Sequence, residues 1–342
     1  MKQRVGLHGL IALVIILSGC GNGESNDRAT ADGPIIIASN PAGTNVYTVA
    51  GGLGKLIQES SGIRATIRPF QGSSVYLPML QRGDVALGLN TNIDGYLSFR
   101  GLPPYASPMT NLRTLGMMFP LNITFMVRAD SDIFRIEDLR GRRVVVTFRA
   151  NAALEQLHRG ILATGDLDFD DIQAMTVAGL GEAAAALQDG RADAVPIGLG
   201  TALGRETDAS LADGIRYLTM GQNEAQLAAI MPGTRVITIE PTESSIGIPA
   251  SIRVSSVPDM LNTGVHLSEE QAYEIIKTIH SNWASMREDI ALLADVSADE
   301  LAPSDNMHPY HTGAVRYFRE AGLWTDSHEA NQIELLELAN TR

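Results

Sequence analysis

The sequence contains one cysteine, Cys20, so a disulfide bond within the chain is excluded. The folded part must therefore be stabilised by burial of apolar groups rather than by covalent cross-links. After residue 20, no uninterrupted apolar run reaches the length of about 18 residues that a membrane-spanning helix needs. The sequence predicts a chain that is anchored to a membrane and does not span one.

Lysine and aromatic residues are also scarce. Only three residues are lysine, and aromatic residues make up 5% of the chain, with two tryptophans. So few rings argue against the stacking platforms that sugar-binding sites use. The formal net charge of −13 argues against a nucleic-acid partner, which would require a basic surface. Nearly all of the positive charge belongs to arginine, whose planar guanidinium suits carboxylate groups.

The first twenty residues have the pattern of an export signal. Lys2 and Arg4 form a basic start, and the apolar run LIALVIIL that follows is too short to span a bilayer. The residues LSGC, which end at Cys20, resemble the lipobox at which bacterial lipoproteins are cleaved and acylated; the alternative is a signal peptide with a chance cysteine. We predict a signal peptide over 1–19, then a lipidated Cys20 and a flexible tether over 20–33.

From residue 34 onward, short apolar segments alternate with helical ones. Strands are predicted over 35–39, 64–70 and 85–89, and a helix ended by Gly62 follows the first strand. This alternation predicts a mostly parallel sheet with helices on both faces. Ligands of such folds bind at the carboxyl ends of the strands. The loops expected to gather there are 40–46, 71–74 and 90–94.

A second set of strands and helices follows between residues 136 and 198. Two β-rich stretches, 122–128 and 246–254, are long enough to cross between two lobes as adjacent strands. The helices predicted over 268–286 and 311–323 should pack back on the first lobe. The predicted organisation is a discontinuous first lobe of 34–125 and 248–342, an inserted second lobe of 126–247, and a ligand cleft between the two.

Common signatures of cofactor binding and catalysis are missing. The run GLGK is followed by Leu56 rather than Ser or Thr, and the sequence holds no GxSxG or SxxK pair. The acidic run 166–171 lacks the glycine and glutamate of a calcium loop. His308 and His311 could be metal ligands, but nothing in the sequence completes a site, and a turn that enters a helix is the favoured interpretation. We predict no cofactor, no metal and no catalytic residue.

Uncharged polar side chains gather in the loops at the strand ends. Helix capping explains any single one of them, because Ser, Thr and Asn favour helix N-termini for local reasons. Three such loops on one edge of a sheet form a stronger pattern, since helix N-terminal amides and hydroxyls together suit a carboxylate. The candidate ligand-binding residues in these loops are Asn40, Thr44, Asn45, Ser73, Ser74, Asn90, Thr91 and Asn92.

The second lobe contributes the loop TFRANA, residues 147–152, with Arg149 and Asn151 as further candidates. Arg149 directly follows a predicted strand, so it should lie at the carboxyl end of that strand and face the cleft. A guanidinium there could hold a carboxylate through two parallel hydrogen bonds. The alternative is a surface arginine that caps a turn or pairs with one of the many acids.

Several stretches, among them NPAGTNVYTVAGGLGKLIQESSG, QGSSVYLPMLQRGDVALGLNTN and MHPYHTGAVRYFREAGL, occur in a consistent order over about 34–323. On these the sequence resembles the TAXI family of solute-binding proteins, which serve tripartite ATP-independent periplasmic (TRAP) transporters. The resemblance implies a type II periplasmic-binding fold of class α/β, with two lobes joined by two crossing strands. It places Tyr47 beside Thr44 and Asn45 in a turn of the binding site. Two departures, a turn poorer in glycine and the loop TFRANA, bear on which ligand is bound.

The resemblance further implies an extracytoplasmic receptor that binds a small carboxylate, a glutamate-like amino acid or another organic acid, and delivers it to a TRAP-type permease without catalysis. The protein is expected to be a monomer, exported, and held by its lipid on a bacterial membrane, facing the periplasm or the cell surface. Two alternatives belong to other classes. One is a surface sensor or adhesin that docks a protein, and the other is an exported enzyme on the same fold, which would need an acid–base pair in the cleft.

Overall fold

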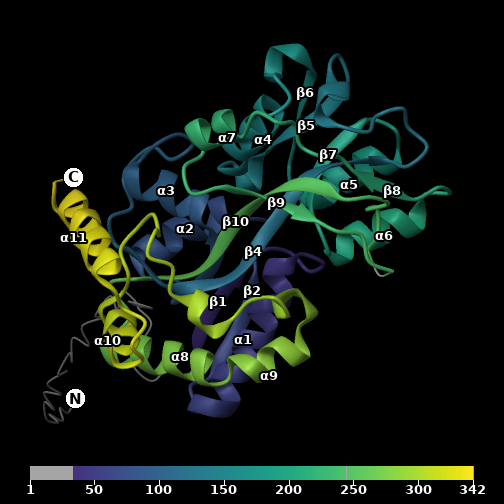
Figure 1. Ribbon diagram of the computed structural model, residues 1–342. Coiled ribbons are helices and arrows are strands. Elements are labelled where there is room, and N and C mark those ends of the chain that lie inside the picture. The colour runs from purple at the N-terminus through teal and green to yellow at the C-terminus, as the bar shows by residue number, and fades with distance from the viewer. Residues whose placement is uncertain (1–33, 244, 342) are drawn as a thin grey trace, which may run out of the picture.

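The computed structural model describes residues 34–243 and 245–341. The predicted signal peptide, the lipidated Cys20 and the tether lie outside these described residues. Over the described ranges, no helix combines the length and the apolar character that crossing a membrane requires. The chain forms two α/β lobes that share one continuous sheet (Figure 1). The predicted fold class is therefore confirmed.

The sheet runs through both lobes in the order β2-β1-β3-β10-β4-β7-β5-β6, with β8 paired to β4 and β9 to β10. Pairing is parallel within the first lobe, between β1 and both β2 and β3, and within the second, between β5 and both β6 and β7. The strands are β1 (Ile35–Ser39), β2 (Ala65–Pro69), β3 (Leu87–Thr91), β4 (Leu112–Arg128), β5 (Arg143–Phe148), β6 (Gln173–Val177), β7 (Ala194–Gly198), β8 (Ile215–Tyr217), β9 (Arg235–Ile239) and β10 (Ile252–Gly264).

The two long strands β4 and β10 cross between the lobes as an antiparallel pair. The stretch 122–128 that the sequence predicts as a crossing strand lies within β4, and only the last residues of the predicted 246–254 belong to β10. The middle of the sheet is antiparallel, because β10 also runs against β3 and β4 runs against β7. Each lobe is thus the parallel unit that was predicted, and the crossing pair joins the two.

Helices cover both faces of the sheet in each lobe. The first helix, α1 (Asn45–Ser61), begins after Thr44, whose side chain accepts a hydrogen bond from the Tyr47 amide, and ends at Gly62 with a φ of 73° that favours glycine. The other α-helices are α2 (Ser73–Arg82), α3 (Asn92–Arg100), α4 (Leu154–Ala163), α5 (Leu180–Gln188), α6 (Ala202–Ser210), α7 (Glu224–Ile230), α8 (Glu269–Ser281), α9 (Trp283–Asp289), α10 (Thr312–Glu320) and α11 (Asp326–Asn340).

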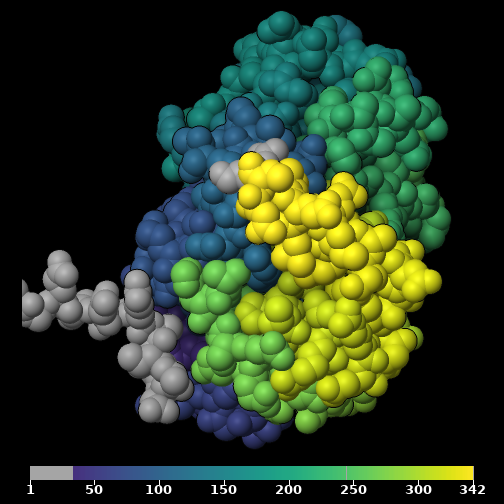
Figure 2. Space-filling model, turned by 90° about the vertical axis from the view of Figure 1, so that its left-hand side faces the viewer, coloured from purple at the N-terminus to yellow at the C-terminus, as the bar shows by residue number. Residues whose placement is uncertain are grey.

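The C-terminal helices α8 to α10 pack on the first lobe. Helix α8 lies beside α1 and α10, so segments from the two ends of the described chain form one body (Figure 1). Trp283 of α9 is fully buried there, and its indole NH donates to the Val296 carbonyl oxygen at 2.9 Å. In Figure 2 this first lobe, purple and blue with yellow, lies below the teal and green second lobe.

The two neighbouring histidines, His308 and His311, have different structural roles. His311 caps α10 by accepting a hydrogen bond from the Gly313 amide, which confirms the predicted helix-entry turn. His308 is buried, and its Nε2 lies 2.8 Å from Asn262 Oδ1. Among the described residues, no group of three or more His, Cys, Asp or Glu side chains could hold a metal ion.

Candidate functional site

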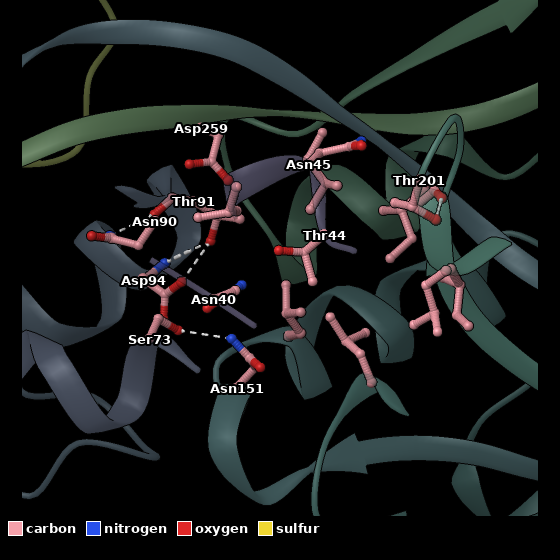
Figure 3. A pocket seen from close by; sticks show the side chains of 18 of the residues that line it. Asn40, Thr44, Asn45, Ser73, Asn90, Thr91, Asp94, Asn151, Thr201 and Asp259 are labelled. Atoms are coloured by element: carbon pink, nitrogen blue, oxygen red, sulfur yellow. Dashed lines mark hydrogen bonds between the residues drawn. The ribbon is translucent and has the colours of Figure 1, made fainter. Parts of the chain in front are cut away.

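A pocket lies between the two lobes, at the carboxyl ends of β1, β3 and β7 (Figure 3). It contains about 600 Å³ of empty space, part of which is open to solvent. Its lining comes from both lobes and from the crossing strands. The lining residues are Asn40, Gly43, Thr44, Asn45, Val46, Ser73, Tyr76, Asn90, Thr91, Asp94, Leu121, Ile123, Asn151, Leu154, Leu180, Ile197, Gly198, Thr201, Leu203 and Asp259.

The wall formed by the first lobe is polar. It combines the β1–α1 loop, the start of α2 and the β3–α3 junction, so the N-termini of three helices face the same space. Thr44 and Thr91 cap α1 and α3, accepting hydrogen bonds from the amides of Tyr47 and Asp94. Helix N-termini carry partial positive charge and unpaired amides, so this wall favours a negatively charged group on a ligand.

The wall formed by the second lobe is mostly apolar. Leu154 and Leu180 come from the starts of α4 and α5, and Ile197 and Leu203 come from the end of β7 and the start of α6. Leu121 and Ile123 of β4 extend this apolar surface, while Thr201 and Asn151 add the polar side chains on this side. A ligand in the pocket would therefore meet polar groups on one side and aliphatic groups on the other.

The two lobes touch on both flanks of the pocket. On one flank, Asn45 Nδ2 donates to the Leu199 carbonyl oxygen at 3.2 Å, and the Leu203 amide donates to the Gly43 carbonyl oxygen at the same distance. On the other, Asn151 Nδ2 donates to Ser73 Oγ at 3.3 Å. The structure therefore shows the cleft in a closed arrangement.

Asp94 lies in the first turn of α3 and is buried. Its Oδ1 accepts hydrogen bonds from Tyr105 Oη at 2.7 Å and from Ser73 Oγ at 3.0 Å. Its Oδ2 accepts one from Thr91 Oγ1 at 2.9 Å. Burial raises the pKa of Asp94, and the hydroxyl donors oppose that rise by favouring the charged form. Asp94 is thus an acid held in place by three hydroxyl groups.

Asp259 is a second buried acid in the pocket, on β10, where it pairs in register with Thr91 of β3. Neither of its carboxylate oxygens has a hydrogen-bond partner. Burial raises the pKa of Asp259 well above its usual range, and the nearby charge of Asp94 raises it further. None of the described residues that line the pocket is Lys, Arg or His, so no basic side chain of the lining offsets these acids.

Replacing Asp259 with asparagine is expected to stabilise the ligand-free protein by about 1–3 kcal/mol at pH 7, because the acid must either bury its charge without a partner or bind a proton on folding, and the neutral amide does neither. Because the pKa of Asp259 is higher in the folded protein than in the unfolded chain, the folded protein takes up a proton between these two pKa values. The contribution of Asp259 to the stability of the wild type therefore falls as the pH rises through this window. The gain should shrink toward pH 4. Urea unfolding at both pH values measures it.

Asp189→Asn, at an exposed acid that ends α5 and pairs with Arg191, is the matched control and should change stability little. An Asp259→Asn variant that unfolds more easily than the wild type at pH 7 would show that the carboxylate stabilises the fold.

The structure brings seven of the sequence-predicted site residues together in the pocket lining. Three others lie outside the lining: Tyr47, with 36% of its surface exposed; Asn92, whose Oδ1 accepts from the Met307 amide; and Arg149, exposed at the start of the short helix Arg149–Asn151. Ser74 also lies outside, and its Oγ accepts a hydrogen bond from the Ala152 amide across the cleft. The seven residues in the lining are Asn40, Thr44, Asn45, Ser73, Asn90, Thr91 and Asn151.

Sequence reasoning missed the two acids and the aliphatic wall. Asp94 could have been found, because it lies two residues beyond Asn92 in the loop 90–94 that was expected to face the ligand. Asp259 carries no such signal, since it lies in the middle of a strand far along the chain. Only the register of β10 against β3 brings it beside Thr91.

Comparisons with known proteins agree with this architecture. A model of the NMT1-like family matches residues 37–322. A structure described as that of a periplasmic transporter aligns with a TM-score of 0.53 at 11% identity, over 87% of this chain and 94% of that one. The periplasmic aliphatic sulphonate binding protein SsuA from Escherichia coli aligns with a TM-score of 0.45 at 16% identity, over 90% of this chain and 87% of that one. A mutant of ArgBP from T. maritima aligns with a TM-score of 0.47 at 16% identity, over 76% of this chain and 93% of that one.

Proposed function

Since the chain belongs to the NMT1-like family, we propose that it is an extracytoplasmic solute receptor, which closes its two lobes on a small molecule. The observation that carries this proposal is the pocket, whose polar wall belongs to one lobe and whose apolar wall belongs to the other. Such a site is complete only when the lobes meet. Closure would then report that a solute is bound, and a transporter could recognise the closed form.

We propose further that the solute carries a carboxylate. Support comes from the N-termini of α1, α2 and α3, which face the pocket and favour an anionic group. Delivery to a TRAP-type permease, membership of the TAXI group, the lipid anchor at Cys20 and the division into lobes at residues 125–126 and 247–248 are parts of the same proposal. The permease and the TAXI membership rest on the sequence resemblance, the anchor on the lipobox pattern, and the lobe boundaries on the two crossing stretches. A ligand contact by Arg149 is also proposed, and it rests on the position of Arg149 directly after β5.

Catalysis is a weaker alternative. Two carboxylates in one pocket are what an acid–base mechanism would require, but the oxygens of Asp94 are already engaged by three hydroxyl groups. Two periplasmic proteins that align with this chain are described as a binding protein and as a transporter. Recovery of a bound solute in a chemically altered form would favour the enzyme. A tight complex with another soluble protein, and no small ligand, would favour a sensor or adhesin.

Binding of the correct solute is expected to stabilise the protein by about 2.7 kcal/mol when its free concentration is a hundred times the dissociation constant. The reason is that the solute binds the closed folded state and not the unfolded chain. A thermal-shift screen of amino acids, hydroxy acids, keto acids and neutral metabolites measures the effect. If no compound raises the melting temperature, the receptor assignment fails.

A further inference from the structure

The pocket holds two acidic side chains, and no basic side chain among the described lining residues is placed to compensate their charge. Asp94 and Asp259 both line it, and Figure 3 shows them on the same side of the space, with Thr91 close to both. The aliphatic side chains of the facing wall add no countercharge. Electrostatic interactions are strong in such an apolar setting, so an unpaired carboxylate there needs a cationic or hydrogen-bond-donating partner.

Two more side chains show the same shortage of donors. Asn40 Oδ1 and Asn151 Oδ1 are buried in this lining without a hydrogen-bond partner. For Asn151 the amide nitrogen is already used, since it donates to Ser73 Oγ. With the two oxygens of Asp259, the fully buried side-chain atoms of the described lining that lack a hydrogen-bond partner are all acceptors. Buried acceptors are normally satisfied, so the missing donors should arrive with the solute.

We propose that the solute carries a protonated amino group, and that Asp259 binds it directly. This inference rests on the proposed receptor function and narrows its solute from acids in general to amino acids. An ammonium group brings three hydrogen-bond donors and one positive charge. It would therefore supply both the donors and the countercharge that the pocket lacks. A hydroxyl or keto group at the same position brings one donor or none, and no charge.

The two acids would have different parts in this contact. Asp259 has both oxygens free and is the direct partner of the ammonium group. Asp94 has its oxygens occupied by Tyr105, Ser73 and Thr91, so it contributes charge from a fixed position and orders the polar wall. The carboxylate of the same solute would lie toward the helix N-termini, so the wall binds the two ends of a zwitterion.

Matched pairs of compounds test this proposal, because they differ only in the amino group. The probes are leucine with 2-hydroxyisocaproate, and glutamate with 2-hydroxyglutarate. Calorimetric titrations use the full chain after dialysis from denaturant, which removes any co-purified solute, and contain EDTA. In the pair that fits the pocket, we expect the amino acid to bind at least about tenfold more tightly, as is typical of a hydrogen bond to a charged group.

Asp259→Asn should weaken binding of the amino acid by about ten- to a hundredfold and change binding of the hydroxy acid by much less. The preference within the pair then disappears, while the variant keeps its cooperative unfolding. Asp189→Asn, an exposed acid far from the lining, should retain the wild-type preference.

Any of four results would overturn the proposal. If the hydroxy acids bind as tightly as the matching amino acids, the receptor function is supported and the contact between Asp259 and an ammonium group is refuted. If the Asp259→Asn variant still prefers the amino acid to the matching hydroxy acid, Asp259 is not the source of the preference. Binding of hydroxy acids that appears only when CaCl₂ or MgCl₂ replaces EDTA would assign the acids to a metal ion. If no compound of either kind binds, the receptor function falls as well.

Discussion

Gly72→Ala is expected to weaken solute binding by roughly a hundredfold. A Cβ atom at Gly72 would lie 2.2 Å from the Ala150 carbonyl oxygen of the opposite lobe and 2.4 Å from Asn151 Oδ1. The nearest atoms include backbone, which cannot swing aside, so the closed arrangement would be penalised by up to about 3 kcal/mol. The backbone of Gly72 is extended, with a φ of 169° that any residue adopts, and the open form should therefore be unaffected.

Calorimetric titration measures the loss of affinity, and small-angle scattering shows whether the variant stays open with solute present. Gly179→Ala is the matched control. Gly179 faces Gln71, but an added Cβ would lie 3.8 Å from the Gln71 carbonyl oxygen, at ordinary contact distance. Its affinity should equal that of the wild type. An unchanged affinity for Gly72→Ala would mean that solute binding does not need this closed contact.

Acidification from pH 7 to pH 4 is expected to remove about 3 kcal/mol of stability through each of two buried histidines. Burial lowers the pKa of His158 to about 4, and burial with the charges of Arg113 and Arg100 lowers the pKa of His308 to about 3. An unfolded histidine binds its proton near pH 6.5, so between these values the unfolded chain holds more protons than the folded one. Stability is therefore complete above about pH 6.5 and is lost as the pH falls.

The raised pKa values of Asp94 and Asp259 act with the opposite sign, since protonation of these acids favours the folded state. The net loss in the wild type should thus be smaller than the sum of the two histidine effects. Urea unfolding of His158→Gln and His308→Gln at pH 7, 5.5 and 4 separates the contributions. Each variant should show a shallower loss of stability with acid than the wild type. Parallel curves for all three proteins would contradict the assignment.

The sequence was sufficient where local rules decide structure. The loops that follow β1 and β3 could be predicted to reach one edge because parallel strands end together, and Thr44 and Thr91 indeed cap helices there. The crossing strand β4 could be located because 122–128 is continuously β-rich. These features depend on residues close together in the chain.

The rest depends on contacts between distant segments. The start of β10 and the pairing of Asp259 with Thr91 follow from the register of strands more than 160 residues apart, which no local pattern specifies. The aliphatic wall joins β4, the starts of α4 and α5, and the β7–α6 junction, which are ordinary core positions when taken singly. Arg149 was expected at the cleft because it follows β5, but the short helix there leaves it exposed and turns Asn151 toward Ser73.

The division of the pocket into a polar wall and an aliphatic wall also has a kinetic consequence. An open receptor would meet its solute first through the polar wall, whose charges and helix ends act over a distance, so the first lobe sets the association rate. The aliphatic wall arrives only on closure and shields the bound molecule from water, so the second lobe sets the residence time. The time for which a solute is held can therefore be changed at Leu154, Leu180 or Ile197 without altering how often it is captured.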